Sequence, residues 1–149
     1  MKYFLDTNIL LHFVRNTKNW QELKVKYNLQ SVENQTYISI VTFAEIKSLT
    51  KQLNWGPLKM ESLEKILFSI PILNITTKIA EQYVEIDVYS QGKDLYRPLP
   101  FGLSARNMGK NDLWIAASAS FIGAILLTTD YDFDHLNLVF LNVQTIEQT

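Results

Sequence analysis

The chain has 149 residues, a formal net charge of −1 and an apolar share of 47%, as expected of a globular protein of about one domain. It lacks cysteine, which excludes disulfides and thiolate metal sites, and its two histidines are too few for a typical imidazole-based zinc site. The balanced charge argues against non-specific coating of nucleic acid, which needs a strong basic excess. We expect one domain over residues 1–149, without a signal peptide or membrane span, in the cytoplasm.

Short apolar runs alternate with amphipathic stretches in the first half of the chain. The pattern predicts a strand, two helices and a β-branched, aromatic strand, at residues 2–5, 8–14, 19–29 and 36–41. Thr42 is a plausible N-cap of the next helix, because Glu45 follows three residues later as in a capping box. That helix is expected to end near Leu53, before the breaking sequence Asn54-Trp55-Gly56-Pro57.

The second half continues the alternation and contains one long loop. A helix is predicted over 58–69, a short buried strand over 70–75, and a helix capped by Thr76 or Thr77 that runs to about Ser90. Residues 91–110 hold three of the five glycines and two of the four prolines, and predict a loop. The remaining predicted elements are a helix and two strands, at residues 111–122, 124–129 and 136–143. This alternation predicts an α/β fold with a mainly parallel sheet of four to five strands.

Four acidic residues stand at comparable places in this pattern. Asp6 closes the apolar run YFLD, Asp130 closes AILLTTD, Asp112 opens a predicted helix, and Glu45 lies one turn into another. The carboxyl ends of parallel strands share one edge of a sheet, where open α/β sheets bind ligands. We therefore expect these four acids to converge on one acidic pocket.

Each acid also has a simpler structural interpretation. Asp6 or Asn8 could merely cap the following helix, and the capping box accounts for Glu45 without any chemistry. Asn111 could serve as the N-cap of its helix, which would leave the carboxylate of Asp112 to face outward over the helix start. Asp130 is followed by Asp132 and Asp134, and a local turn explains one of these three acids and solvent exposure another.

The available ligands favour a metal that binds oxygen, namely magnesium or manganese. Several carboxylates in one pocket repel one another, and a divalent cation removes that repulsion. Two such ions about 4 Å apart can activate water and stabilise the leaving oxygen of a phosphodiester. Metal-assisted phosphodiester hydrolysis therefore fits this chain better than acyl transfer or redox chemistry.

Four motifs in order, FLDTN, FAEI, NDLWIAA and LLTTDYDF, resemble a PIN-domain ribonuclease, specifically a VapC-type toxin of a type II toxin–antitoxin system. The resemblance implies a three-layer PIN-like, Rossmann-like fold, Mg²⁺- or Mn²⁺-dependent endoribonuclease activity, a homodimer, and inhibition by a cognate antitoxin protein. It implies that the catalytic, metal-binding acids are Asp6, Glu45, Asp112 and Asp130, with Asp132 as an auxiliary metal ligand. Positions that would orient the substrate or support the acids are Thr7, Asn8, Asn111 and Thr128.

The loop at 91–110 departs from compact members of that family by its length. Its cations, Lys93, Arg97, Arg106 and Lys110, could hold RNA phosphates or could merely keep the loop soluble. Of these we assign Arg106 and Lys110 to RNA binding. Tyr96 and Phe101 could stack on an unpaired base, although Phe101 could equally pin the loop to the body of the protein.

Other function classes fit less well. A receiver-like signalling domain would want a second acid beside Asp6 and an aspartate where Asn74 stands, and a haloacid-dehalogenase-type phosphatase would want an aspartate in place of Asn8. A catalytically silent module that binds RNA or an antitoxin would not need the intact set of acids.

Overall fold

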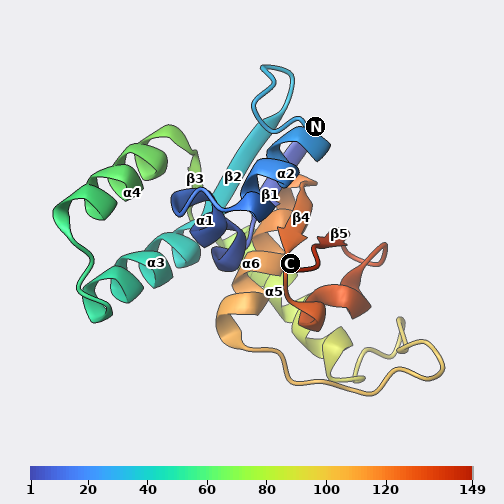
Figure 1. Ribbon diagram of the computed structural model, residues 1–149. Helices are drawn as coiled ribbons and strands as arrows, with labels where there is room; N and C mark the ends of the chain where they lie inside the picture. Colours follow the sequence, from blue (N-terminus) through green and yellow to red (C-terminus); the bar gives the residue numbers. More distant parts are fainter. Residues whose placement is uncertain (149) are drawn as a thin grey trace.

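Five parallel strands form the centre of the part of the chain that the structure describes, residues 1–148 of a computed structural model (Figure 1). Thr149, the last residue of the predicted domain, lies outside the described residues. The strands are ordered β3-β2-β1-β4-β5. Their bounds are β1 Lys2–Leu5, β2 Gln35–Ser39, β3 Ile72–Leu73, β4 Ile125–Thr128 and β5 Asn142–Thr145. The parallel five-stranded sheet agrees with the predicted fold class.

Helices cover both faces of this sheet. They are α1 Thr7–Val14, α2 Lys18–Lys26, α3 Ile40–Gln52, α4 Pro57–Ser69, α5 Thr77–Ser90 and α6 Lys110–Ile122, followed by a short 3₁₀ helix, η1 Tyr131–Leu136. Successive side chains of a strand point to opposite faces. Phe4 accordingly packs in one core with α5, α6 and η1, whereas Tyr3 and Leu5 pack in the other with α1 to α4. The result is a three-layer α/β fold.

Strand β1 lies at the point where the order of the sheet reverses. It pairs with β2 on one side and with β4 on the other, both in parallel. The chain builds β2 and β3 on the first side, crosses through α5 and α6, and adds β4 and β5 on the second. Ligand sites of open α/β sheets lie at the carboxyl ends of the strands at such a reversal.

Three predicted elements are corrected by the structure. The strand predicted over 36–41 ends at Ser39, because the Ser39 hydroxyl accepts a 3.0 Å hydrogen bond from the Val41 N–H and caps α3. The predicted strand over 70–75 is reduced to Ile72–Leu73, a half-buried edge strand. The last strand, predicted over 136–143, lies further along the chain: η1 occupies 131–136, Leu138 has φ +62°, and β5 spans Asn142–Thr145.

Two predicted helix caps are also wrong. Helix α3 begins at Ile40, so Thr42 is a buried residue inside its first turn and no capping box with Glu45 forms. Helix α6 begins at Lys110 after Gly109, so Asn111 is its second residue and not its N-cap. The helix predicted over 8–14 begins one residue early, at Thr7, with Asp6 as its N-cap.

Helices α3 and α4 form a pair that projects from the sheet, and the 91–109 loop extends at the opposite side of Figure 1. Among residues 1–148, no helix combines the length and the apolar character that crossing a membrane requires.

Candidate active site

The four acids that the sequence singled out line one pocket at the carboxyl edge of the sheet. Asp6, Glu45, Asp112 and Asp130 all contribute to a cavity of about 390 Å³. They come from four different elements: the end of β1, helix α3, the first turn of α6 and the segment after β4. The topology thus brings together residues that no local pattern connects.

Asp6 is buried, with 5% of its surface exposed, and both of its carboxylate oxygens are hydrogen-bonded. Oδ1 accepts from the Thr7 N–H at 2.7 Å, and Oδ2 accepts from the Thr128 hydroxyl at 2.7 Å. Burial raises the pKa of Asp6, while these two hydrogen bonds oppose the rise. Asp6 therefore does cap α1, as the simpler interpretation held, and its carboxylate also lines the pocket.

The pKa of Asp112 is raised strongly by its surroundings. Burial is the largest cause, followed by the charges of Asp6, Asp130, Glu45 and Asp132, and together they raise the pKa of Asp112 from 3.8 to about 6. Gly109, the N-cap of helix α6, offers no side-chain cap, and Asp112 is the acidic residue of the first helical turn. A carboxyl group whose neighbours raise its pKa in this way is suited to bind a cation.

Asp130 and Asp132 stand at the start of η1. Oδ1 of Asp130 accepts from the Asp132 N–H at 2.8 Å, so Asp130 caps the 3₁₀ helix. The Thr128 hydroxyl that donates to Asp6 also accepts from the Asp130 N–H, at 3.0 Å. A single threonine side chain thereby fixes the ends of β1 and β4 relative to each other.

Glu45 is oriented from across the pocket by Thr7. The Thr7 hydroxyl lies 2.8 Å from Oε1 of Glu45 and 3.2 Å from the hydroxyl of Thr42. This network replaces the capping box as the explanation of why a glutamate occupies this half-buried position. One oxygen of Glu45 is thus held by α1, and the carboxylate faces the other acids in the pocket.

The donor set fits a divalent cation. One carboxylate oxygen from each of Asp112, Asp130 and Asp132 can be chosen so that all three lie within 4.8 Å of one another. Oxygens that share an Mg²⁺ or Mn²⁺ ion each lie about 2.0–2.2 Å from it, so opposite ligands stand about 4 Å apart. Asp6 and Glu45 line the same pocket outside this closest group, where they could complete a shell or meet a second ion.

The residues predicted to contact a substrate lie partly in the acidic pocket and partly beside it. Thr7 and Asn8 line the acidic pocket. Arg106 approaches from the loop, and its Nη1 donates to the main-chain oxygen of Asp132 at 3.3 Å. Lys110 and Asn111 are exposed at the first turn of α6, beside Asp112.

Sequence reasoning missed part of the pocket lining. Ser48, Leu49 and Gln52 of α3 and Leu11 of α1 line the same cavity. Ser48, Leu49 and Gln52 lie three, four and seven residues after Glu45, a spacing that places them on the same face of the helix as Glu45. Helical periodicity from Glu45 would therefore have identified them.

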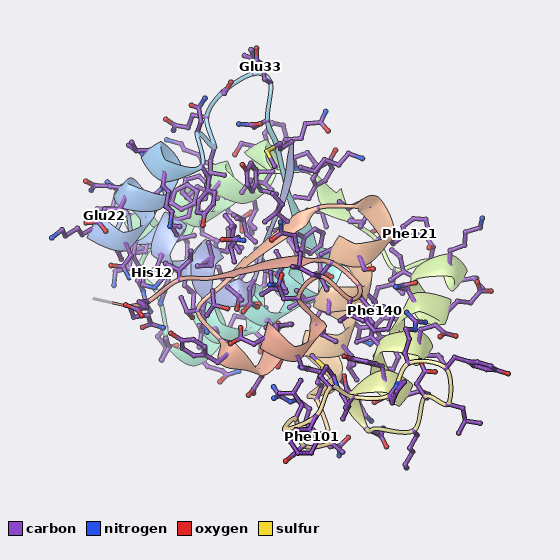
Figure 2. The ribbon with its side chains drawn as sticks, turned by 90° about the vertical axis from the view of Figure 1, so that its right-hand side faces the viewer. His12, Glu22, Glu33, Phe101, Phe121 and Phe140 are labelled. Atoms are coloured by element: carbon purple, nitrogen blue, oxygen red, sulfur yellow. The ribbon has the colours of Figure 1, made fainter. Side chains whose placement is uncertain are left out.

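The loop at 91–109 is anchored at some of its predicted functional residues and free at others. Arg97 is paired with Glu85 and Asp94 at 3.1 and 3.4 Å, and its guanidinium stacks over Phe140, so the structure assigns it to anchoring the loop. Phe101 is fully exposed at the edge of the molecule (Figure 2), which contradicts the interpretation that it pins the loop. Tyr96 is also exposed.

The PIN domain family matches residues 3–138 of this chain. No curated protein matches it in sequence.

Solved structures with a similar fold include chains of three complexes. A chain of VapBC2 from Rickettsia felis, bound to a DNA fragment from their promoter, superposes with a TM-score of 0.74 at 21% identity, covering 97% of this chain and 98% of that one. For VapBC-1 from nontypeable Haemophilus influenzae the TM-score is 0.68 at 23% identity, with coverages of 97% and 98%. For FitAcB from Neisseria gonorrhoeae it is 0.68 at 23% identity, with 95% of each chain covered. At these identities the similarity concerns the fold.

Proposed function

The chain belongs to the PIN domain family, whose members are generally nucleases, and from this premise we propose that it is a Mg²⁺- or Mn²⁺-dependent endoribonuclease that serves as the toxin of a toxin–antitoxin pair. The observation that carries the proposal is the group of carboxylates from Asp112, Asp130 and Asp132, which stands within range of one cation beside Asp6 and Glu45. A pocket of oxygen ligands alone, at a sheet reversal, supports hydrolysis of a phosphodiester better than chemistry that needs a thiolate or imidazole.

The five acids divide into three roles in this proposal. Asp112, Asp130 and Asp132 would hold the cation, which supplies charge neutralisation and water activation when it is bound. Asp6, fixed by two hydrogen bonds, presents its remaining acceptor capacity to the same pocket. Glu45, whose Oε1 is held by Thr7, keeps Oε2 for a second cation or for orienting the attacking water molecule.

RNA phosphates would approach an acidic pocket only with help from neighbouring donors. Asn8 on the pocket wall and Arg106, Lys110 and Asn111 at its margin carry N–H groups that can bind phosphate oxygens. With Thr7, these residues are our proposed substrate contacts.

We also propose that a cognate antitoxin protein inhibits the chain and that the chain forms a homodimer. Support for the antitoxin comes from the VapBC matches and from a toxin–antitoxin complex from Klebsiella pneumoniae, which has 22% identity and a TM-score of 0.66 to this chain. Sedimentation of the purified protein tests the homodimer, and RNA cleavage measured with and without the product of the neighbouring reading frame tests the inhibition.

The catalytic proposal is tested by incubating total RNA with the protein and Mg²⁺ or Mn²⁺. Asp112→Asn and Asp6→Asn should each reduce cleavage by about two orders of magnitude or more, because each removes a carboxylate from the pocket. Asp134→Asn is the matched control, since Asp134 is an exposed acid of η1 that accepts a hydrogen bond from Thr145 and does not line the acidic pocket. Equal cleavage by folded Asp112→Asn and wild-type protein, or cleavage that survives chelation, would refute the proposal.

A further inference from the structure

Thr42 is a polar residue that lies fully buried in the first turn of α3, beside Thr7. None of its surface is exposed, and it does not line the acidic pocket. Among residues 1–148, its hydroxyl has a single hydrogen-bond contact, at 3.2 Å from the hydroxyl of Thr7. A buried hydroxyl without a partner destabilises a fold, so the polar atom of Thr42 depends on Thr7.

The number of available hydrogens determines the direction of this contact. The Thr7 hydroxyl has one hydrogen, and it also lies 2.8 Å from Oε1 of Glu45. An ionised carboxylate can only accept, so Thr7 donates its hydrogen to Glu45 and keeps a lone pair for Thr42. The three residues therefore form a relay: Thr42 donates to Thr7, and Thr7 donates to Glu45.

Thr7 connects this relay to a second acid of the pocket. Its main-chain N–H donates to Oδ1 of Asp6 at 2.7 Å, while its hydroxyl holds Glu45. Asp6 and Glu45 are the two acids that line the pocket outside the closest cation-binding group. Thr42 is thus linked, through Thr7 alone, to the part of the pocket that these two acids form.

A donor behind Thr7 restricts what the Thr7 side chain can do. Thr7 is only half-buried at the pocket wall, where its hydroxyl could rotate and exchange Glu45 for water. A buried donor on its other side favours the rotamer in which the hydrogen faces Glu45. Hydrogen bonds that follow one another in the same direction also polarise and strengthen each other.

We propose that Thr42 is a positioning residue for Glu45. Its buried hydroxyl fixes the hydroxyl of Thr7, which holds Oε1 of Glu45 and leaves Oε2 facing the pocket. The inference rests on the proposed nuclease function and adds to it a residue that lies outside the pocket. Because Thr42 lines no surface that RNA can reach, it should affect the rate of cleavage and not the binding of RNA.

The first measurement is steady-state cleavage, at saturating Mg²⁺, of a labelled fragment of an RNA that the wild type cleaves in total RNA. Thr42→Val replaces the hydroxyl by a methyl group. It should lower kcat by about tenfold and leave KM within about twofold of the wild-type value. Thr42→Ser, which retains the hydroxyl, should restore kcat to within about threefold of the wild type.

Thr50→Val is the matched control. Thr50 is another buried threonine of α3, its hydroxyl donates to the main-chain oxygen of Lys47 at 2.8 Å, and it does not line the acidic pocket. This variant loses the same chemical group from the same helix and should keep the wild-type kcat. Denaturant unfolding of both variants verifies that each is folded at the assay temperature.

Two double-mutant cycles distinguish positioning from a merely structural effect. In the Glu45→Gln background, Thr42→Val should lower kcat by no more than about twofold, because the residue that it positions is already lost. In a cycle of unfolding free energies, measured without RNA or metal, Thr42→Val and Thr7→Val should be non-additive, since both remove one contact.

The outcomes separate this inference from the proposed function. Metal-dependent cleavage by the wild type, with an equal kcat in Thr42→Val, would overturn the role of Thr42 and leave the nuclease proposal intact. A loss of about tenfold that recurs in the Glu45→Gln background, or additive unfolding free energies, would overturn it as well. Absence of cleavage by the wild type with either metal would overturn the nuclease proposal and this inference with it.

Discussion

The Thr128 hydroxyl donates a 2.7 Å hydrogen bond to Oδ2 of Asp6 across the central pair of strands. It links the end of β4 to the end of β1 in a buried position, beside the candidate cation site. A buried ionised carboxylate is stable only while its oxygens are satisfied. The acidity of Asp6 and the alignment of the two strands therefore depend on the same bond.

We expect Thr128→Val to raise the pKa of Asp6 further, because the substitution removes a hydrogen bond that favours the ionised form. The variant should lose about 1–3 kcal/mol of unfolding free energy at neutral pH, and its activity should require a higher pH. Denaturant unfolding and a pH–rate profile measure both effects. Thr145→Val is the control, since Thr145 makes the same kind of bond to Asp134 at an exposed site; a loss as large there would contradict the prediction.

Asp112 should make the metal-free protein less stable as pH rises. Its pKa in the folded protein, about 6, exceeds its ordinary value of 3.8, so the folded state holds the proton more tightly than the unfolded chain. The stability that protonation contributes is present below about pH 4 and is lost as pH rises through about 6. Asp112→Asn should therefore raise the thermal midpoint of the metal-free protein at about pH 7.5.

A bound cation should reverse this dependence of stability on pH. Mg²⁺ or Mn²⁺ should stabilise the wild type at about pH 7.5, and the stabilisation should shrink below about pH 6 as protons compete for Asp112. Asp112→Asn should lose most of the stabilisation. Thermal unfolding over a metal titration at two pH values measures this, and an equal metal effect in the variant would show that Asp112 is not a ligand.

The hydrogen bond between Thr7 and Glu45 should couple their contributions to activity. We expect Glu45→Gln to reduce metal-dependent cleavage by about 10–100-fold and Thr7→Val by about tenfold, because Thr7 holds Oε1 of Glu45 in place. Since the two residues act through one contact, the double variant should be little worse than Glu45→Gln alone. Additive losses in the double-mutant cycle would separate Thr7 from Glu45.

Ser90→Ala should destabilise the protein by about 1–3 kcal/mol. Nδ1 of His135 already lacks a hydrogen-bond partner among the described residues, and the substitution would leave Nε2 without one as well. Ser69→Ala, which removes an exposed hydroxyl at the end of α4, should cost less than about 0.5 kcal/mol. Similar unfolding free energies for both variants would contradict the prediction.

His135 should also contribute to acid sensitivity. Burial and the nearby charge of Arg106 lower the pKa of His135 from 6.5 to about 4. Between about pH 4 and pH 6.5 the unfolded chain therefore binds a proton at His135 that the folded protein does not bind. The stability that depends on neutral His135 is present above about pH 6.5 and is lost as pH falls toward 4. His135→Phe should flatten this part of the curve of stability against pH, as measured by denaturant unfolding.

Strand ends and acids could be predicted together because the same local pattern encodes both. An apolar run that stops at an aspartate marks the end of a buried strand: β1 ends directly before Asp6, and β4 ends two residues before Asp130. Glu45 lies in the predicted helix, but the capping box with Thr42 that predicted this helix does not form. Ile40 and Val41 favour a strand by propensity, but the Ser39 cap and burial of the helix face determine the outcome.

The remaining features depended on contacts that are distant in sequence. The position of β5 is set by its register with β4, in which Thr128 aligns with Thr145, and not by the apolar run before it. Ser90 holds Arg106 of the loop and His135 of η1, which lie 16 and 45 residues further along the chain. No local sequence pattern predicts that Ser90 contacts both segments.

The central position of β1 also determines when the acidic pocket can form during synthesis. The two residues joined by the Thr128–Asp6 bond are 122 positions apart, and β1 obtains its second neighbour only when β4 has been made. A nascent chain that ends at Asn111 contains Asp6 and Glu45 but neither Asp112 nor Asp130. Domains fold as units while the ribosome adds residues in order. The complete set of carboxylates therefore exists only after Asp130 has been added, 124 residues after Asp6.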